Sequence, residues 1–234
     1  MNIQKLKRIV KGFYTTPYWS QYGEDLVYLD LIRKNVFPQK GFYVDLGCNE
    51  PKNLSQTFTL YQRGWNGVCV DLDERVSNKF KKIRPNDMFM NVAILPGSDE
   101  REVEVNIGVS TLHSRLKSAD DLLIERGIYH DTTNEKTKKV SGLGVNKLLE
   151  RYSPGKIDLL SVDIEGSDEE IIQSIDYEKF EIRAIILEHH CFKNSDGSHL
   201  LETSLYRFLE ARDYVLASMN LVNALMVKKH ILRY

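Results

Sequence analysis

The stretch Tyr43-Val44-Asp45-Leu46-Gly47-Cys48-Asn49 decides the fold of this chain. Its apolar start predicts a short strand, and Gly47 then lets the backbone turn tightly enough for a ligand to approach it. Asp45 and Asn49 offer polar contacts beside that turn. Helix-like spacing at 55–63 leads to a second apolar strand at 67–71. This succession predicts a parallel sheet with ligand loops at the carboxyl ends of its strands.

The same alternation continues to the end of the chain. An earlier helix is expected after Ser20, ended by Pro38 and Gly41, and the capping box Ser167-Asp168-Glu169-Glu170 predicts the start of another helix. We therefore expect one α/β domain with helices on both faces of the sheet. The other expected elements are helices at 76–83 and 200–212, strands at 88–94, 103–107, 157–164 and 183–188, and a closing hairpin of 214–218 and 224–227.

Composition and charge exclude several classes of function. The formal net charge of -1 provides no basic field for a polyanion, which argues against nucleic acid as a partner. No apolar run approaches the roughly 20 residues of a transmembrane helix, and the start lacks the apolar core of a secretory signal, so we expect a cytoplasmic protein. Cys48, Cys69 and Cys191 fit neither a disulfide framework nor the paired spacing of a zinc site.

Two segments stand apart from the predicted sheet. Residues 1–19 are predicted to form a basic, amphipathic helical segment. Its apolar stripe through 2–11 predicts docking on the domain or weak attachment to an anionic membrane surface or a partner. The main domain spans 20–234. Its polar insertion near 113–139 is predicted to be either a substrate lid or an inert loop, and its lone His113 could reach a substrate.

The glycine spacing narrows the choice of cofactor. A dinucleotide fingerprint needs three glycines, and this loop offers only Gly47 before Pro51, so a pyrophosphate cradle is not predicted. S-adenosylmethionine carries no phosphate, but an acid at the end of the second strand could accept hydrogen bonds from its ribose hydroxyls. Asp71 stands at that position, and Asp73 could share the role. Asn91, at the end of the third strand, is expected beside the adenine.

Several blocks together resemble the FkbM family of methyltransferases over residues 18–228. The resemblance implies a Rossmann-like class I methyltransferase sheet of seven mostly parallel strands, the last one antiparallel, and methyl transfer from S-adenosylmethionine, usually to oxygen. It also adds Gln21, in the opening motif, to the cofactor-binding residues. Two positions depart from the family pattern, Asp71-Leu72 and Cys48. The matching blocks are Ser20-Gln21-Tyr22-Gly23-Glu24-Asp25, 43–49, 55–57, 64–67, Arg84-Pro85, 91–94, 110–112 and 157–166.

Polar side chains also follow the two later strands, on the rim that carries the cofactor loop. Methyl transfer to a hydroxyl is an in-line displacement, so the protein must hold the acceptor oxygen at about 3 Å and help to remove its proton. A base or a metal ion could do this. The candidate catalytic residues are Asp163, Glu165, His189 and His190, and the candidate cofactor-binding residues are Gln21, Asp45, Gly47, Asn49, Asp71, Asn91 and Asp163.

Two roles stay open for this rim. Asp163, Glu188 and His189 could hold a divalent ion such as Mg²⁺ or Mn²⁺, in a set similar to that of metal-dependent O-methyltransferases. Alternatively, His189 or His190 could act as the base, with a neighbouring carboxylate orienting its ring. Asp163 could also bind only the amino-acid end of the cofactor.

The sequence thus predicts an O-methyltransferase that acts on a small molecule or glycan. The resemblance points to a sugar hydroxyl, in a nucleotide-activated sugar or a surface-polysaccharide component. Two alternatives remain: a nucleotide-dependent sugar oxidoreductase or epimerase, which the missing glycines disfavour, and a noncatalytic binding protein that retains the fold.

Overall fold

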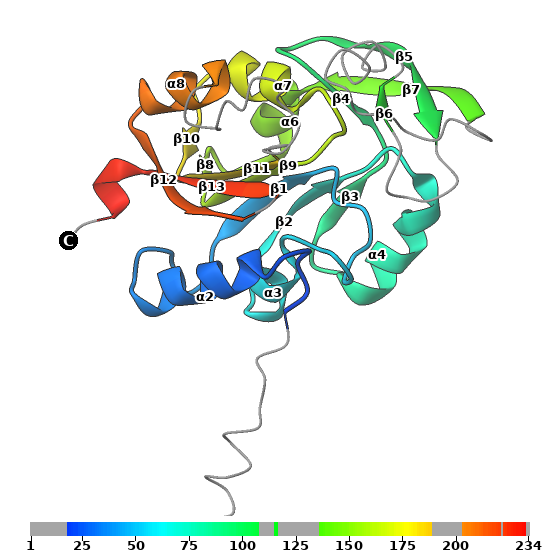
Figure 1. Ribbon diagram of the computed structural model, residues 1–234. Coiled ribbons are helices and arrows are strands. Elements are labelled where there is room, and N and C mark those ends of the chain that lie inside the picture. The colour runs from blue at the N-terminus through cyan, green and yellow to red at the C-terminus, as the bar shows by residue number, and fades with distance from the viewer. Residues whose placement is uncertain (1–17, 108–114, 117–135, 189–202, 221, 233–234) are drawn as a thin grey trace, which may run out of the picture.

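The computed structural model describes residues 18–107, 115–116, 136–188, 203–220 and 222–232. A seven-stranded sheet runs through its centre (Figure 1), and its strand order is β12-β13-β11-β9-β1-β2-β3. All neighbouring strands are parallel except around β13, which pairs antiparallel with both β11 and β12. The strands are β1 (Phe42–Leu46), β2 (Asn66–Val70), β3 (Met88–Met90), β9 (Leu159–Val162), β11 (Ala184–Glu188), β12 (Tyr214–Met219) and β13 (Asn223–Lys228).

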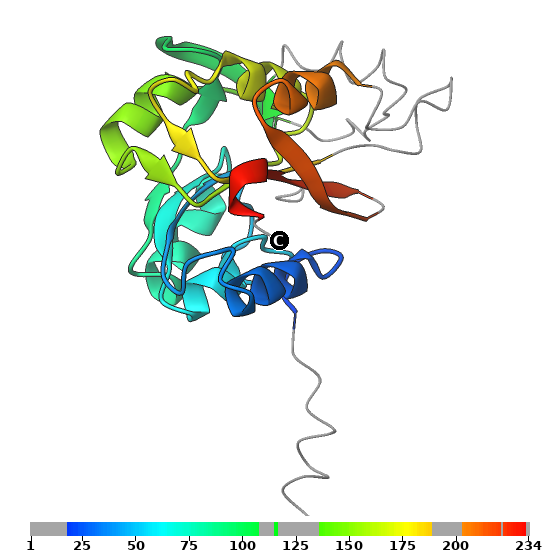
Figure 2. The ribbon, with the colours of Figure 1, turned by 90° about the vertical axis from the view of Figure 1, so that its left-hand side faces the viewer.

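Helices cover both faces of this sheet, as the views in Figures 1 and 2 show. Side chains alternate along each strand, so Val44 and Leu46 enter one core and Tyr43 enters the other. The first core is closed by α6 (Val145–Tyr152), α7 (Asp168–Ser174) and α8 (Ser204–Glu210). The second is closed by α2 (Glu24–Arg33), α3 (Phe58–Gln62), the 3-10 turn η1 (Glu74–Val76) and α4 (Ser77–Ile83). A further 3-10 turn, η5, covers Lys229–Ile231.

The seven-stranded, mostly parallel sheet and its antiparallel closing hairpin confirm the predicted fold class. Most predicted elements lie within a few residues of their observed bounds, including the helix of the opening motif and both hairpin strands. Among the described residues, no helix is long and apolar enough to cross a membrane. The predicted helix at 2–11 and His113 lie outside the described residues.

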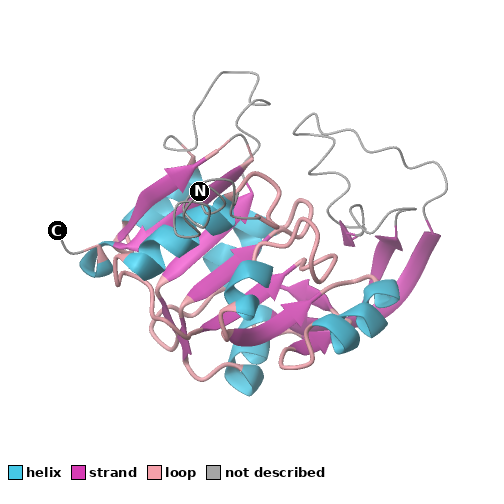
Figure 3. Cartoon of the chain, turned by 90° about the horizontal axis from the view of Figure 1, so that it is seen from below, coloured by secondary structure: helices cyan, strands magenta, loops and turns pink. Residues whose placement is uncertain are grey.

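A second sheet is the main correction to the predicted architecture (Figure 3). The single strand predicted at 88–94 is wrong, because the chain leaves β3 at Met90 and enters a different sheet as β4. The insertion predicted near 113–139 also ends too late, since its last residues begin β7. The second sheet contains β4 (Ala93–Leu95), β7 (Lys136–Gly144), β5 (Glu100–Ile107) and β6 (Arg115–Leu116), and a separate pair joins β8 (Lys156–Ile157) to β10 (Glu181–Ile182).

The capping box predicted for α7 is also wrong. The helix begins where expected, but the Ser167 side chain makes no capping hydrogen bond. The Asp168 carboxylate instead accepts hydrogen bonds from the backbone N–H groups of Ile164 (3.0 Å) and Gly166 (3.1 Å). The acidic side chain therefore braces the loop before the helix, a role that the sequence pattern did not distinguish from a cap.

Candidate functional site

The candidate site is positioned by residues that pair in register across four strands of the central sheet. Leu46 pairs in register with Val70 on one side and Val162 on the other, and Val162 pairs with Leu187. The residues that come next, Gly47, Asp71, Asp163 and Glu188, therefore emerge together at the carboxyl edge of β1, β2, β9 and β11. This is the edge at which open parallel sheets bind ligands.

Gly47 is required by the close approach of two loops at this edge. Its backbone has φ 81°, in the left-handed region that favours glycine. A Cβ atom at Gly47 would lie 1.7 Å from the carbonyl oxygen of Asp163. The N–H groups of Gly47 and Cys48 both donate to the Val70 carbonyl, at 2.9 and 3.0 Å. The turn after β1 is thereby fixed against both neighbouring strand ends.

Asp71 is held in a fixed orientation at the end of β2. One carboxylate oxygen accepts from the N–H of Asn49 and the other from the N–H of Asp73, both at 2.8 Å. The Asn91 side-chain amide donates to the Asp71 carbonyl at 2.9 Å. Burial raises the pKa of Asp71 to about 6, although the two N–H groups act in the opposite direction. Asp71, Asn49 and Asn91 therefore do come together, as predicted from their places after three strands.

Asn49 contributes a polar atom that has no partner within the described part of the chain. Its backbone has φ 47°, a conformation that asparagine tolerates better than most residues. Its side-chain Oδ1 is buried and receives no hydrogen bond there. A buried acceptor without a donor is unfavourable by about 1–3 kcal/mol, so this atom keeps an unused capacity to accept a hydrogen bond.

Asp73 does not share the role of Asp71 in this arrangement. Its carboxylate accepts from the Arg75 backbone N–H at 2.9 Å and from Arg75 Nε at 2.8 and 2.7 Å. It thereby begins η1 as its N-cap. The bidentate contact with arginine occupies both oxygens, so the sequence-based suggestion that Asp73 also serves the ribose finds no support in this geometry.

Asp45 lies beneath the loop, where its side chain is 2% exposed as part of a buried network. Thr57 Oγ1 donates to Asp45 at 2.5 Å, and Arg84 Nη2 lies 2.8 Å from the same Thr57 oxygen. Arg84 Nε also donates to Asp87 at 2.6 Å, and Nη2 to the Tyr43 hydroxyl at 2.9 Å. This Arg84 network was missed from sequence as a functional element, and the Arg84-Pro85 block was its only signal.

Asp163 faces several negative charges. Burial raises the pKa of Asp163 well above its ordinary value, and repulsion from Glu188, Asp168 and Glu165 raises it further. Glu165 (φ 57°) and Gly166 (φ 105°) form a tight left-handed turn that brings the acidic loop back to the sheet edge. Carboxylates crowded in this way favour a ligand that brings positive charge or a proton.

With this geometry established, comparison with known proteins gives the family. The Methyltransferase FkbM domain matches residues 45–216. The chain belongs to the FkbM methyltransferase family. It is also similar to a TehB-like SAM-dependent methyltransferase from Corynebacterium glutamicum, with 11% sequence identity and a TM-score of 0.41, over 97% of this chain and 96% of that one. No curated protein matches the chain.

The segment 20–25, which precedes the residues matched by the family model, anchors the start of the domain. Asp25 accepts hydrogen bonds from the Trp19 N–H (2.7 Å), Ser20 Oγ (2.9 Å) and Thr59 Oγ1 (2.6 Å), which ties the motif to α3. Gln21, the residue predicted from this motif to bind the cofactor, is exposed. Its role at the cofactor stays a prediction, while the acidic end of the motif has a clear structural role.

The two candidate catalytic histidines, His189 and His190, lie outside the described residues. Within the part of the chain that the structure describes, no group of three His, Cys, Asp or Glu side chains could hold a metal ion. Asp163 and Glu188 are close enough for their charges to interact, but the third predicted ligand is His189. The metal site therefore stays a prediction.

Proposed function

We propose that this FkbM protein transfers a methyl group from S-adenosylmethionine to a hydroxyl oxygen of a sugar or a related small molecule. Family membership supports methyl transfer in general. The row of strand ends at Gly47, Asp71 and Asp163 supports a cofactor site, because three polar loops meet there beside a buried acceptor without a partner. The proposal assigns this edge to the cofactor and the adjoining edge at Glu188 to the acceptor.

The residues at this edge suit the groups that S-adenosylmethionine presents. Asp71 would accept from the ribose hydroxyls, since its carboxylate is already aimed by two backbone N–H groups. Asn49 Oδ1 would gain a donor, and Asn91 holds the Asp71 loop from the adenine side. The negative charge around Asp163 would be relieved by the ammonium group of the cofactor. S-adenosylmethionine would supply an activated methyl group.

Asp45 and Gly47 have supporting roles in this proposal. Gly47 lets the loop after β1 pack against the Asp163 carbonyl. Asp45 positions that loop from below through Thr57, which in turn contacts the buried Arg84. Direct binding of Asp45 to the cofactor would need its side chain to leave this network, so we assign it a positioning role.

Removal of the acceptor proton is assigned to this edge of the sheet, with Asp163, Glu165, His189 and His190 as the candidate groups. The raised pKa of Asp163 makes its carboxylate a stronger proton acceptor than an ordinary one. A divalent ion held by Asp163, Glu188 and His189 would serve the same end. Adding EDTA to an activity assay separates the two mechanisms, because only a metal-dependent enzyme loses activity and regains it with Mg²⁺ or Mn²⁺.

The orientation of the Asp71 carboxylate is the main support for a cofactor site, and binding measurements on Asp71 variants test it. Calorimetry with adenosylhomocysteine should show one site per chain, and NAD should show none. Asp71→Ala should weaken binding by about 10- to 100-fold, since hydrogen bonds to a charged group contribute about 1.5–3 kcal/mol. Asp30→Ala, which removes an exposed acid on α2, should leave binding unchanged. Absence of adenosylhomocysteine binding to the unmodified protein would contradict the proposed function.

A further inference from the structure

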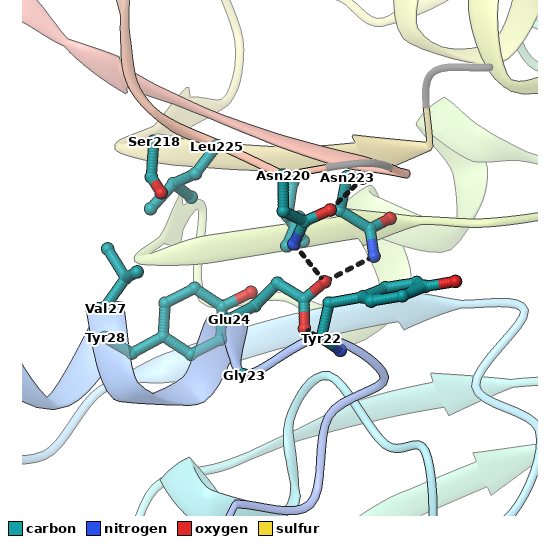
Figure 4. Close-up of a pocket in the computed structure, with 10 residues that line it drawn as sticks. Tyr22, Gly23, Glu24, Val27, Tyr28, Ser218, Asn220, Asn223 and Leu225 are labelled. Atoms are coloured by element: carbon teal, nitrogen blue, oxygen red, sulfur yellow. Dashed lines mark hydrogen bonds between the residues drawn. The ribbon is translucent and has the colours of Figure 1, made fainter. Parts of the chain in front are cut away.

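A cleft outside the cofactor edge lies between α2 and the β12–β13 hairpin (Figure 4). It holds ≈ 80 Å³. Three residues in register on neighbouring strands form its floor. Ile186 of β11 pairs with Leu225 of β13, and Leu225 pairs with Ser218 of β12. Val27 and Tyr28 of α2 form the opposite wall. Polar and apolar side chains thus contribute to the cleft in similar measure, and its size suits one edge of a small ring rather than a whole large ligand.

A bulge in β12 brings Ser218 to the cleft. The register with β13 shifts between Leu216 and Ser218, so that Ala217 is left over and Ser218 stands opposite Leu225. In an uninterrupted ladder Ala217 would occupy that place, and Ser218 would point to the other face. Bulges recur beside binding sites because they re-aim a side chain in this way. In Figure 4, Ser218 and Leu225 both project from the strands toward α2.

Glu24 closes the end of the cleft nearest the candidate catalytic rim. One oxygen of its carboxylate accepts from the side-chain amides of Asn220 (2.7 Å) and Asn223 (2.6 Å), and the other from the Tyr22 N–H (3.0 Å). Burial alone would raise the pKa of Glu24, but these hydrogen bonds lower it, so the group is ionised. Both carboxylate oxygens already accept hydrogen bonds without any cation.

Tyr28 carries a buried hydroxyl group in the wall of the cleft. The residue is 0% exposed, and its phenol oxygen has no hydrogen-bond partner within the described residues. Burial, together with the charges of Glu24 and Asp45, keeps the pKa of Tyr28 well above its ordinary value, so the hydroxyl keeps its proton and can donate. Figure 4 shows its ring projecting from α2 into the space below the hairpin. Buried tyrosine hydroxyls are usually paired, which makes this one a marker for a ligand.

We propose that the cleft binds a neutral, hydroxyl-bearing ring of the methyl acceptor, with Tyr28 and Ser218 as its hydrogen-bond partners. The inference rests on the proposed function, since it names where the acceptor is held. The cleft adjoins the candidate catalytic rim, because Asn223 at its end pairs in register with Glu188. A ring seated there would therefore extend toward the edge at which the acceptor hydroxyl must meet the cofactor.

The chemistry of the cleft selects a neutral ligand. The Tyr28 and Ser218 hydroxyls can each donate and accept, which matches the hydroxyl groups of a sugar. Ile186, Leu225 and Val27 would contact the C–H faces of the same ring. An anionic group would be repelled by the ionised Glu24, whose partners among the described residues are N–H groups of amides and backbone, with no lysine or arginine among them.

Tyr28→Phe tests the inference, because it removes only the unpartnered oxygen. With the cofactor site saturated by adenosylhomocysteine, binding of the methyl glycosides of glucose, galactose, mannose, rhamnose and N-acetylglucosamine is followed by saturation-transfer NMR. At least one glycoside should bind the unmodified protein. Tyr28→Phe and Ser218→Ala should each weaken that binding at least fivefold. Tyr152→Phe, the same change on α6 across the sheet, should leave it unchanged.

The melting temperature separates a ligand role from a structural one. Loss of an unpartnered hydroxyl should leave the melting temperature of Tyr28→Phe unchanged or higher, while a structural hydroxyl would lower it. A lower melting temperature, equal glycoside binding by Tyr28→Phe and the unmodified protein, or no binding of any glycoside would each overturn the inference. Failure of the proposed function would appear separately, as absence of adenosylhomocysteine binding.

Discussion

Two groups of carboxylates stand in different surroundings in this protein. Asp87, Asp158 and Glu24 each accept several hydrogen bonds from N–H groups of the fold, and those of Glu24 lower its pKa. Asp71 and Asp163, at the carboxyl edge of the central sheet, have raised pKa values. The first group is completed by the fold itself. Asp163 also faces the charges of Glu188, Asp168 and Glu165, and carboxyl groups with raised pKa values are candidates for a binding or catalytic site.

The largest loss of stability is expected from removing the arginine that pairs with Asp87, a member of the first group. Arg84 and Asp87 have fully buried side chains that contact at 2.6 Å, so Arg84→Met leaves the charge of Asp87 unpaired. The free energy of unfolding should fall by about 3–5 kcal/mol, measured by urea denaturation. Lys79→Met, which removes an exposed ion pair with Glu50, should change it by less than about 1 kcal/mol. Equal losses for the two variants would contradict the distinction between buried and exposed pairs.

A smaller loss is expected for Glu24→Gln, which removes the charge that the two asparagine amides contact. Hydrogen bonds to a charged group contribute about 1.5–3 kcal/mol, and the free energy of unfolding should fall by about that amount at pH 7. Because the folded pKa of Glu24 lies below its ordinary value of 4.5, its contribution is present above that pH and is lost as the pH falls through the folded value. The difference between variant and unmodified protein should therefore shrink in acid.

The control for this variant is Glu210→Gln, at the exposed last residue of α8. It should change the free energy of unfolding by no more than about 0.5 kcal/mol at any pH. A loss for Glu24→Gln that stayed constant down to pH 3 would show that the carboxylate charge is not what its amide partners recognise.

The central sheet could be predicted from sequence because its strands are buried on both faces. Phe42–Leu46 and Leu159–Val162 are nearly continuous apolar runs with turn residues after them, and this pattern also fixes which residues lie at the carboxyl edge. The second sheet lacks such a signal. The first four residues of β7, Lys136 to Lys139, are exposed and polar, so the strand depends on backbone pairing with β5 rather than on an apolar face.

The site could be predicted only as far as strand ends determine it. The places of Asp71, Asn91 and Gly47 at the edge of the sheet could be predicted because position after a strand is a property of the sequence; their contact with a cofactor stays a prediction. The partners of Asp45 and Asp73 were not, because Thr57 and Arg75 become ligands of those carboxylates only through the path of the loops. An aspartate after a strand can bind a ligand or stabilise a loop, and the sequence alone does not distinguish the two roles.

In the second group, ionisation of Asp71 should make cofactor affinity depend on pH. Ribose hydroxyls donate to a carboxylate, so the proposed binding requires Asp71 to be ionised, and its pKa in the free protein is about 6. The affinity for adenosylhomocysteine should therefore be constant above pH 7 and weaken by about tenfold at pH 5, as followed by calorimetry. Asp71→Asn should bind more weakly at pH 7 and show a flat profile. A tenfold decline that persisted in Asp71→Asn would assign the titration to another group.

The smallest expected change in the free energy of unfolding is an increase, and it comes from removing the charge of Asp163 in the second group. Asp163→Asn removes a charge that burial and the neighbouring Glu188 disfavour, so the free energy of unfolding should rise by about 1 kcal/mol at pH 7 while methyl transfer declines. Since the folded pKa of Asp163 is raised, the folded state of the unmodified protein binds the extra proton, and its stability increases as the pH falls toward 3.8. The variant should lack this increase.

Asp158→Asn is the matched change in the first group. Asp158 accepts from the Phe42 N–H at 3.0 Å and from Arg183 at 3.2 Å, so the same substitution should there lower the free energy of unfolding. Urea denaturation of the two asparagine variants at pH 7 compares them directly. Opposite signs would show that the fold stabilises the charge of Asp158 but not that of Asp163, as expected of a group kept for a ligand. Destabilisation by both would place Asp163 with the structural carboxylates and return the search for the catalytic group to the histidines that follow Glu188.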